Sequence, residues 1–170
     1  MKRISILGAT GSIGRQALEV VERFPERLEL VGVSASCSVE ELGKIVLKHH
    51  PKAVALTRPA SIDPSRRDLL ASFSSLGIDL YLGEEGLVEL VRREDVDLVL
   101  VAVVGIAGLR PTLEALKRGK TVALATKEAL VAGGKLVKRA IKEGGGRLLP
   151  VDSEHSAIFQ CLEGRRREDV

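Results

Sequence analysis

Short apolar runs rich in β-branched residues alternate with amphipathic segments along the whole chain. Each run has the length of a buried strand, and between the runs apolar residues recur every three or four positions, as on one face of a helix. The expected strands are residues 4–7, 28–33, 53–56, 79–82, 98–103, 121–125 and 147–151. The expected helical faces lie within residues 13–24, 42–46, 69–76, 87–91, 109–116 and 136–141.

Strand–helix units in series predict an α/β fold, a doubly wound parallel sheet with helices on both faces. Leu98 to Val103 is apolar throughout, which is typical of a central strand. Residues 57–63 are expected to form the longest surface connection, and Asp63-Pro64 predicts the start of the next helix. Ligands of such sheets bind beyond the carboxyl ends of the strands, so the polar segments that follow the strands are the candidate sites.

Composition narrows the class of protein. Of 170 residues, 45% are hydrophobic and 29% are charged, which fits one packed domain, or one domain with the start of a second. A net charge of +3 and an aromatic content of 2% argue against a nucleic-acid partner. The longest purely apolar run, Leu98 to Val104, is far too short to span a membrane, so no membrane partner is expected.

The cysteines and the start of the chain indicate a reducing compartment. Cys37 and Cys161 are far apart and have no spacing typical of a zinc cluster or a disulfide framework. The chain enters its first expected strand without the pattern of a signal peptide. A cytoplasmic location is therefore expected.

Three glycines, Gly8, Gly11 and Gly14, lie between the first expected strand and the first expected helix. Glycine there permits a tight turn, close approach of a pyrophosphate and close packing of the helix on the strand. The amides at the helix start and the hydroxyls of Thr10 and Ser12 suit phosphate oxygens. The spacing G-x-x-G-x-x-G differs from the usual G-x-G-x-x-G, so a purely steric turn is the alternative. Its place in the first strand–helix turn favours a Rossmann-like dinucleotide-binding domain.

The end of the second expected strand selects between the two nicotinamide dinucleotides. An NAD site usually has an acid there, whereas this chain has Ser36, Cys37 and Ser38, with its first acid at Glu40. Hydroxyls and a helix start can accept a 2′-phosphate, so NADP(H) is predicted over NAD(H). The alternative is that these serines only cap the helix that begins near Val39. No Arg or Lys lies in the turn, so the preference is expected to be weaker than with a guanidinium clamp.

Two carboxylates follow the last expected strand. Asp152 and Glu154 are two residues apart, and in an extended chain both side chains point to the same side. Two hard oxygen ligands suit Mg²⁺ or Mn²⁺ and leave open positions for a chelating substrate. The alternative is that Asp152, Ser153 and Glu154 form the N-cap and first turn of a helix over 156–162, where acids are common. His155 is expected to be a packed or solvated residue at the helix start.

A third polar segment, Thr126, Lys127 and Glu128, follows the strand at 121–125. Lys127 suits an anionic substrate and Glu128 suits a cofactor ribose, while the alternative is an ordinary helix start with an acid in its first turn. Residues 105–108 contain two glycines after the central strand, which either admit a ligand close to the backbone or form a plain turn.

Four segments together resemble the N-terminal part of the 1-deoxy-D-xylulose 5-phosphate reductoisomerase family. They occur in the family's order, and the last is highly specific; they are residues 8–14, 104–109, 127–131 and 150–160. The resemblance implies a catalytic set of Lys127, Asp152 and Glu154, with Asp152 and Glu154 as ligands of the divalent metal. The implied substrate contacts are Lys127, Ser153 and Glu154. The implied cofactor contacts are Gly8, Thr10, Gly11, Ser12, Ile13, Ser36, Cys37, Ser38, Thr126 and Glu128.

The activity that the resemblance implies converts 1-deoxy-D-xylulose 5-phosphate to 2-C-methyl-D-erythritol 4-phosphate in non-mevalonate isoprenoid biosynthesis. Chelated hydroxyketone oxygens permit a rearrangement of the carbon skeleton, and hydride from NADPH then reduces the aldehyde. Family members are usually dimeric and much longer, with a further metal-binding Glu, substrate-phosphate ligands and a lid beyond residue 170. Residues 1–150 are therefore expected to be the cofactor domain and 151–170 the start of a catalytic domain, in a chain that binds NADPH but turns over little alone.

Two segments depart from the family's pattern. The family commonly has Gly-Lys-Asn where this chain has Ser36, Cys37 and Ser38, which removes a cation from the expected phosphate pocket. It usually has Asn and Ser where this chain has Thr126 and Ala129, which removes an amide contact to the cofactor.

Two other functions stay open on the sequence. Another NADP-dependent oxidoreductase, such as a semialdehyde dehydrogenase, would need a catalytic cysteine after a central strand, and neither Cys37 nor Cys161 has that place. A non-catalytic NADPH sensor would need no metal, so replacing Asp152 and Glu154 would leave its behaviour intact.

Overall fold

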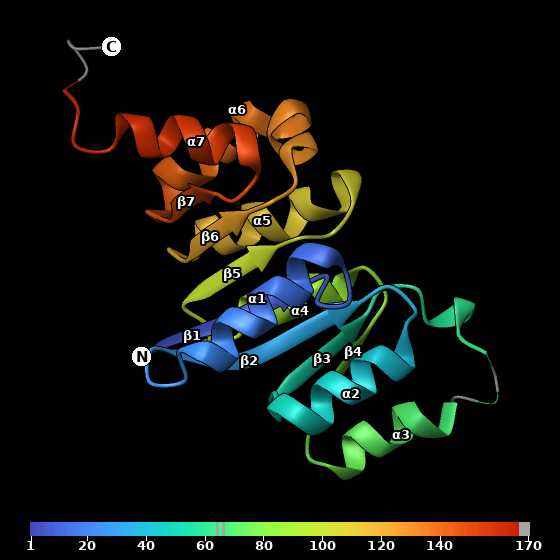
Figure 1. Ribbon diagram of the computed structural model, residues 1–170. Coiled ribbons are helices and arrows are strands. Elements are labelled where there is room, and N and C mark those ends of the chain that lie inside the picture. Colours follow the sequence, from blue (N-terminus) through green and yellow to red (C-terminus); the bar gives the residue numbers. More distant parts are fainter. Residues whose placement is uncertain (64, 66, 167–170) are drawn as a thin grey trace.

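The computed structural model describes residues 1–63, 65 and 67–166. In this part of the chain, strands form a seven-stranded sheet in the order β4-β3-β2-β1-β5-β6-β7, with parallel pairing throughout. The strands are β1 Lys2–Leu7, β2 Leu28–Ala35, β3 Ala53–Leu56, β4 Asp79–Leu82, β5 Leu98–Val101, β6 Thr121–Leu124 and β7 Arg147–Pro150. The chain thus builds outward from β1 to β4 in one direction and then from β5 to β7 in the other (Figure 1).

Helices connect the strands and cover both faces of the sheet. They are α1 Ser12–Arg23, α2 Val39–His49, α3 Arg67–Ser75, α4 Glu85–Arg92, α5 Leu109–Lys117, α6 Lys127–Gly144 and α7 Ser153–Leu162. Short 3₁₀ turns cover Pro59–Ser61 and Gly105–Gly108. Figure 1 shows α2 and α3 at one end of the molecule and α7 beside β7 at the other.

The core consists of two apolar layers, one on each face of the sheet. Leu42 of α2 and Phe73 of α3 belong to the first layer, together with α1. Leu90 of α4 belongs to the second layer, which α5 and α6 complete. Strand residues alternate between the layers, so that in β3 Val54 faces the first and Ala55 the second. This two-sided burial explains why apolar residues predominate on both faces of the central strands, with Ser5 and Ser34 as buried polar exceptions.

The doubly wound parallel sheet predicted from the alternation of segments is confirmed. Four residues of the expected helical faces are exposed instead of packed: Val20 at 48%, Phe24 at 38%, Leu76 at 58% and Leu136 at 51%. Phe24 and Leu76 follow the ends of α1 and α3. Leu136 precedes the buried Val137 by one position, which rotates its side chain away from the packed face. The expected helix start at Pro64 lies outside the described residues. None of the described helices combines the length and the apolar character needed to cross a bilayer.

Candidate cofactor and metal site

Residues 8–14, here called the glycine turn, join β1 to the first residues of α1, and their three glycines have different roles. Gly8 has a φ of +89°, and a Cβ there would lie 2.6 Å from the carbonyl oxygen of Ala102, just beyond β5. A Cβ on Gly14 would lie 2.2 Å from the Gly8 carbonyl oxygen, so α1 packs directly on the turn. At Gly11 the nearest such atom is the Gly8 oxygen at 3.4 Å, an ordinary contact. The fold therefore requires Gly8 and Gly14, whereas Gly11 leaves room for a ligand.

The first turn of α1 offers backbone N–H groups beside Gly11. Gly11 is the N-cap residue, no side chain caps the helix, and the first turn contains no acid. The Arg15 amide donates to the Gly11 carbonyl at 3.0 Å, so the amides of Ser12 and Ile13 precede the first such bond and have no partner within the helix. Unpaired amides and the positive end of the helix dipole suit an anion. These residues fit the pyrophosphate of a dinucleotide.

Ser34 at the end of β2 holds the glycine turn in place. It is fully buried, and its Oγ accepts a hydrogen bond from the Gly8 amide at 2.9 Å. Its carbonyl oxygen accepts another from the Ala9 amide at 2.8 Å. Both polar groups of Ser34 thus hold the glycine turn. Ser36 and Ser38 remain as the candidates for ligand binding.

Ser36, Cys37 and Ser38 are half-buried at the carboxyl end of β2. Ser38 occupies the N-cap position of α2, but its side chain makes no capping hydrogen bond. The helix-capping alternative therefore has no hydrogen bond to support it at Ser38. Cys37 is half-buried, and the other cysteine, Cys161, is exposed on α7.

The segment after β3 brings a guanidinium to this place. The Arg58 amide donates to the Ser36 carbonyl oxygen at 2.9 Å, and the Arg58 Nε donates to the Ser36 Oγ at 2.7 Å. The turn after β2 contains no Arg or Lys, but the segment after β3 supplies the cation of Arg58. The pocket expected from the sequence comprises only the turn after β2, so Arg58 was missed. The pattern does contain a pointer: Arg58 follows one expected strand as Ser36 follows the previous one, and both strands are parallel.

The expectation of an extended chain over residues 152–154 is wrong. Helix α7 begins at Ser153, and Asp152 is its N-cap residue. The Asp152 Oδ1 accepts a hydrogen bond from the His155 amide at 2.9 Å and lies 2.7 Å from the His155 Nδ1. Partial burial alone would raise the pKa of Asp152, but these two hydrogen bonds outweigh it and lower the pKa. The helix-capping alternative is thus confirmed for Asp152, since a capping acid and a metal-binding acid have the same local sequence.

Glu154 is exposed on the first turn of α7 and joins the two polar segments that follow β6 and β7. Its Oε1 lies 3.1 Å from the Lys127 Nζ, and its Oε2 accepts a hydrogen bond from the Ser153 Oγ at 2.9 Å. The hydrogen bond from Ser153, a backbone hydrogen bond and the Lys127 ammonium lower the pKa of Glu154 to about 2. The same contact raises the pKa of Lys127. Both groups are therefore charged at neutral pH.

Thr126 and Glu128 flank Lys127 but differ in their surroundings. Thr126 is buried, and its Oγ1 donates to the Val103 carbonyl oxygen at 2.6 Å. This bond ties the carboxyl ends of β5 and β6 together. Glu128 is exposed on the first turn of α6.

Residues 152–154, here called the acidic segment, provide two hard oxygen donors, from Asp152 and Glu154. Within the described residues, no group of three or more His, Cys, Asp or Glu side chains has the geometry to hold a metal ion. Mg²⁺ in proteins is commonly held by one or two carboxylates, with waters and substrate oxygens as its other ligands. The donor set therefore fits a partly open Mg²⁺ or Mn²⁺ site.

The glycine turn and the acidic segment lie at the same edge of the sheet. The turn follows β1, the acidic segment follows β7, and the parallel strands β5 and β6 lie between them. Adjacent strands are about 4.8 Å apart, so β1 and β7 are separated by about 14 Å. An extended dinucleotide that starts at the glycine turn can cross that span.

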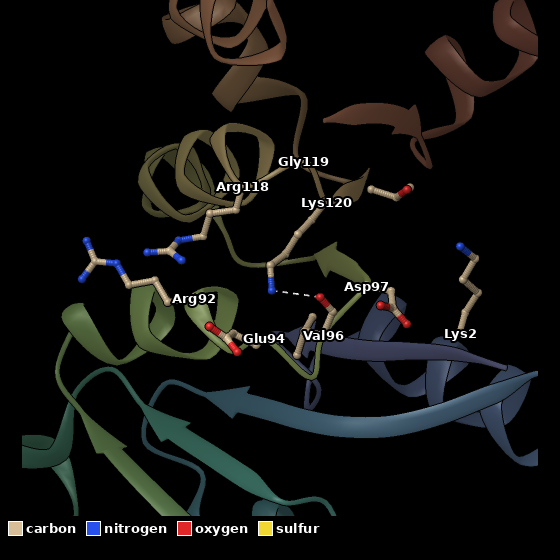
Figure 2. A pocket seen from close by; sticks show the side chains of 9 residues that line it. Lys2, Arg92, Glu94, Val96, Asp97, Arg118, Gly119 and Lys120 are labelled. Carbon is tan, nitrogen blue, oxygen red and sulfur yellow. Dashed lines mark hydrogen bonds between the residues drawn. The ribbon is translucent and has the colours of Figure 1, made fainter. Parts of the chain in front are cut away.

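A hollow of about 430 Å³ lies at the opposite edge, where the strands begin (Figure 2). In the described part of the chain, three of its four cations, all except Lys2, have partners. Lys120 donates to the Val96 carbonyl oxygen at 2.9 Å, and Arg92 and Arg118 both contact Glu114. This hollow is therefore part of the scaffold and offers no free cation cluster for an anionic ligand.

The glycine turn lies at the point where the strand order reverses, between β1 and β5. A doubly wound sheet with an open helix N-terminus at this position defines a dinucleotide-binding domain of the Rossmann class.

Comparison with known proteins identifies the family. Residues 4–134 match the family model of 1-deoxy-D-xylulose 5-phosphate reductoisomerase. The chain is 51% identical over 170 residues to the 1-deoxy-D-xylulose 5-phosphate reductoisomerase of Chloroherpeton thalassium, which covers 100% of this chain and 43% of that protein. The chain therefore belongs to the 1-deoxy-D-xylulose 5-phosphate reductoisomerase family, and it spans less than half the length of that relative.

Solved structures agree with this assignment. The Zymomonas mobilis enzyme in complex with NADPH matches with a TM-score of 0.87 and 37% identity, over 98% of this chain and 43% of that one. A reductoisomerase in complex with magnesium matches with a TM-score of 0.83 and 37% identity, over 95% and 40% of the two chains. The family resemblance and the Rossmann-like fold expected from the sequence are thus confirmed.

Proposed function

We propose that this chain is the NADPH-binding part of a reductoisomerase that converts 1-deoxy-D-xylulose 5-phosphate to 2-C-methyl-D-erythritol 4-phosphate. The observation that carries the proposal is the position of the glycine turn and the acidic segment at one edge of the sheet. Family membership supports the reaction, and the relatives solved with NADPH and with magnesium support the cofactors.

In this proposal the cofactor lies across the carboxyl ends of β2, β1, β5 and β6. The turn at Gly8 and the amides at the start of α1 bind its pyrophosphate, with the hydroxyls of Thr10 and Ser12 as further donors. The 2′-phosphate lies at the end of β2, beside Ser36, Cys37 and Ser38. The nicotinamide extends toward Thr126 and Glu128, which places it next to the acidic segment. NADPH supplies the hydride for the reduction.

The metal and substrate belong to the segments that follow β6 and β7. Asp152 and Glu154 are the proposed ligands of Mg²⁺ or Mn²⁺, which supplies Lewis-acid polarisation of substrate oxygens when bound. Glu154 now holds Lys127, so cation binding requires this ion pair to open. The released Lys127 is an exposed lysine, which stays an ammonium at neutral pH, and it orients the anionic substrate together with the Ser153 hydroxyl.

Family membership also supports proposals about turnover, domain division, oligomeric state and location. The relatives are more than twice as long as this chain, so we expect the 170 residues to bind NADPH with little substrate-dependent oxidation of it. Residues 1–150 form the cofactor domain in this proposal and residues 151–170 begin a catalytic domain, although residues 167–170 lie outside the described part. We further expect a homodimeric cytoplasmic enzyme.

The experiment that tests this proposal measures Mn²⁺ and NADPH binding separately. In the double variant Asp152→Ala, Glu154→Ala, we expect loss of Mn²⁺ binding, because both hard oxygen ligands are gone, with NADPH affinity within about twofold of the parent. Electron paramagnetic resonance of free Mn²⁺ and the fluorescence of bound NADPH provide the two readouts.

The same experiment separates the competing functions. Equal Mn²⁺ binding by the parent and the double variant would contradict the metal site and would favour an NADPH sensor that needs no metal. A parent chain that does not bind NADPH would contradict the cofactor-binding role itself. Exposed carboxylates remote from the site provide the matched control: Glu26→Ala, Glu143→Ala should change neither measurement.

A further inference from the structure

The parallel pairing of β2 with β3 determines where Arg58 lies. In the sheet, Ala35 is paired with Leu56. The pairing continues past the strand ends, since the Thr57 amide donates to the Ala35 carbonyl oxygen at 3.1 Å and the Arg58 amide donates to the Ser36 carbonyl oxygen at 2.9 Å. Arg58 is therefore held by its own backbone beside Ser36, rather than by a contact at the end of a flexible side chain.

The Arg58 side chain then points back over the same residue. Its Nε donates to the Ser36 Oγ at 2.7 Å. Neither terminal nitrogen of the guanidinium has a hydrogen bond or a carboxylate partner within the described part of the chain. Four N–H bonds of the fork are thus left to solvent or to a ligand, in the geometry that matches phosphate oxygens.

Two other basic side chains, on α2 and α1, contact other parts of the chain. Lys44 on α2 pairs with Glu41 at 2.8 Å. The Arg15 Nε donates to the Thr10 carbonyl oxygen at 3.0 Å, on the glycine turn. Arg58 is consequently the guanidinium that the structure places against the serines at the end of β2.

We propose that Arg58 binds the 2′-phosphate of NADPH, with Ser36 and Ser38, and that it is the residue that selects NADPH over NADH in this chain. This inference rests on the proposed cofactor-binding function. It replaces the expectation, drawn from the turn alone, of a pocket without a cation. The guanidinium reaches the pocket from β3 instead of from the turn after β2.

The test compares two dinucleotides that differ only in the 2′-phosphate. In Arg58→Gln, we expect the Kd for NADPH to rise about tenfold or more, because a charge-assisted contact to phosphate is lost. The Kd for NADH should stay within about twofold, since NADH has no 2′-phosphate for Arg58 to bind. Arg58→Lys should restore part of the NADPH affinity, as it keeps the charge without the bidentate fork.

Three further measurements make the result specific. Arg139→Gln removes another exposed arginine, paired with Glu143 on α6, and should leave both constants unchanged. Adenosine 2′,5′-bisphosphate and 5′-AMP lack the nicotinamide half and differ in the 2′-phosphate. Arg58→Gln should weaken binding of the bisphosphate and leave binding of 5′-AMP unchanged. The thermal unfolding midpoint of each variant confirms that the fold is intact, as expected for an exposed side chain.

The outcomes separate this inference from the proposed function. Parent NADPH binding with an unchanged NADPH-to-NADH ratio in Arg58→Gln, or an equal loss of both ligands, would overturn the role of Arg58 and leave the cofactor domain standing. A parent chain that binds neither dinucleotide would contradict the proposed function and the role of Arg58 with it.

Discussion

Glycine, which has no Cβ, serves two purposes in the turn after β1. At Gly14 a methyl group would lie 2.2 Å from a backbone oxygen, and backbone atoms cannot move aside as a flexible side chain can. At Gly11, whose φ is −77°, a methyl group meets only an ordinary contact at 3.4 Å. The sequence predicts the motif, but only the coordinates separate the glycine that the fold needs from the glycine that a ligand needs.

The same substitution to alanine is therefore expected to affect mainly stability at Gly14 and mainly NADPH affinity at Gly11. Gly14→Ala is expected to lower the free energy of unfolding by about 3 kcal/mol through overpacking of α1 on the turn. Gly11→Ala is expected to lower it by less than about 1 kcal/mol, the effect of a poorer N-cap residue. The affinity of Gly11→Ala for NADPH should nevertheless fall about tenfold, because the methyl group obstructs the approach of the pyrophosphate.

Urea unfolding and NADPH titration of both variants check these expectations. Gly14→Ala with the stability of the parent would contradict the close packing of α1. Gly11→Ala with the NADPH affinity of the parent would contradict the position of the pyrophosphate.

At the scale of elements, the strands were the part of the fold that the sequence predicted well. Burial on both faces produces the purely apolar run at residues 53–56. This strand and the partly exposed edge strand at 79–82 were both predicted with the bounds that the structure has. The start of α7 was predicted only as an alternative, because Asp152 and Glu154 are equally compatible with a helix cap and with an extended metal-binding segment. Arg58 was missed because only the succession of parallel strands, and not the turn after β2 itself, points to its contact with Ser36.

The Arg3–Asp97 ion pair joins the amino ends of β1 and β5. The Arg3 Nη2 lies 2.8 Å from the Asp97 Oδ1, and the Arg3 backbone amide and Nε donate to Oδ2. The hydrogen bonds from the Arg3 side chain and amide lower the pKa of Asp97 well below its usual range. A carboxylate whose pKa is lowered by folding stabilises the folded state above its unfolded-state pKa of about 4, and this contribution is lost as the pH falls further.

Asp97→Asn is therefore expected to be less stable than the parent by about 1 kcal/mol at pH 7, a modest value because the pair is partly exposed. The difference should shrink steadily below about pH 4, where the parent loses the same charge. Urea unfolding between pH 2.5 and 7 measures it. A difference that does not depend on pH would show that the charge of Asp97 has no part in the stabilisation.

At the scale of the whole molecule, the order of the strands explains how segments far apart in the sequence form one site. The glycine turn follows the first strand and the acidic segment follows the last, yet parallel pairing brings both to one edge. The hollow of Figure 2 lies at the other edge, where Arg92 and Arg118 are paired with Glu114. The candidate site and the hollow therefore lie at opposite edges of the sheet.

Paramagnetic relaxation by Mn²⁺ tests this arrangement most directly. With NADPH and Mn²⁺ both bound to the chain, the nicotinamide protons are expected to relax much faster than the adenine protons, because the acidic segment lies beside the nicotinamide end. The effect should disappear with Mg²⁺ or in the variant Asp152→Ala, Glu154→Ala. Equal relaxation of both rings, or none in either, would contradict a shared site for cofactor and metal.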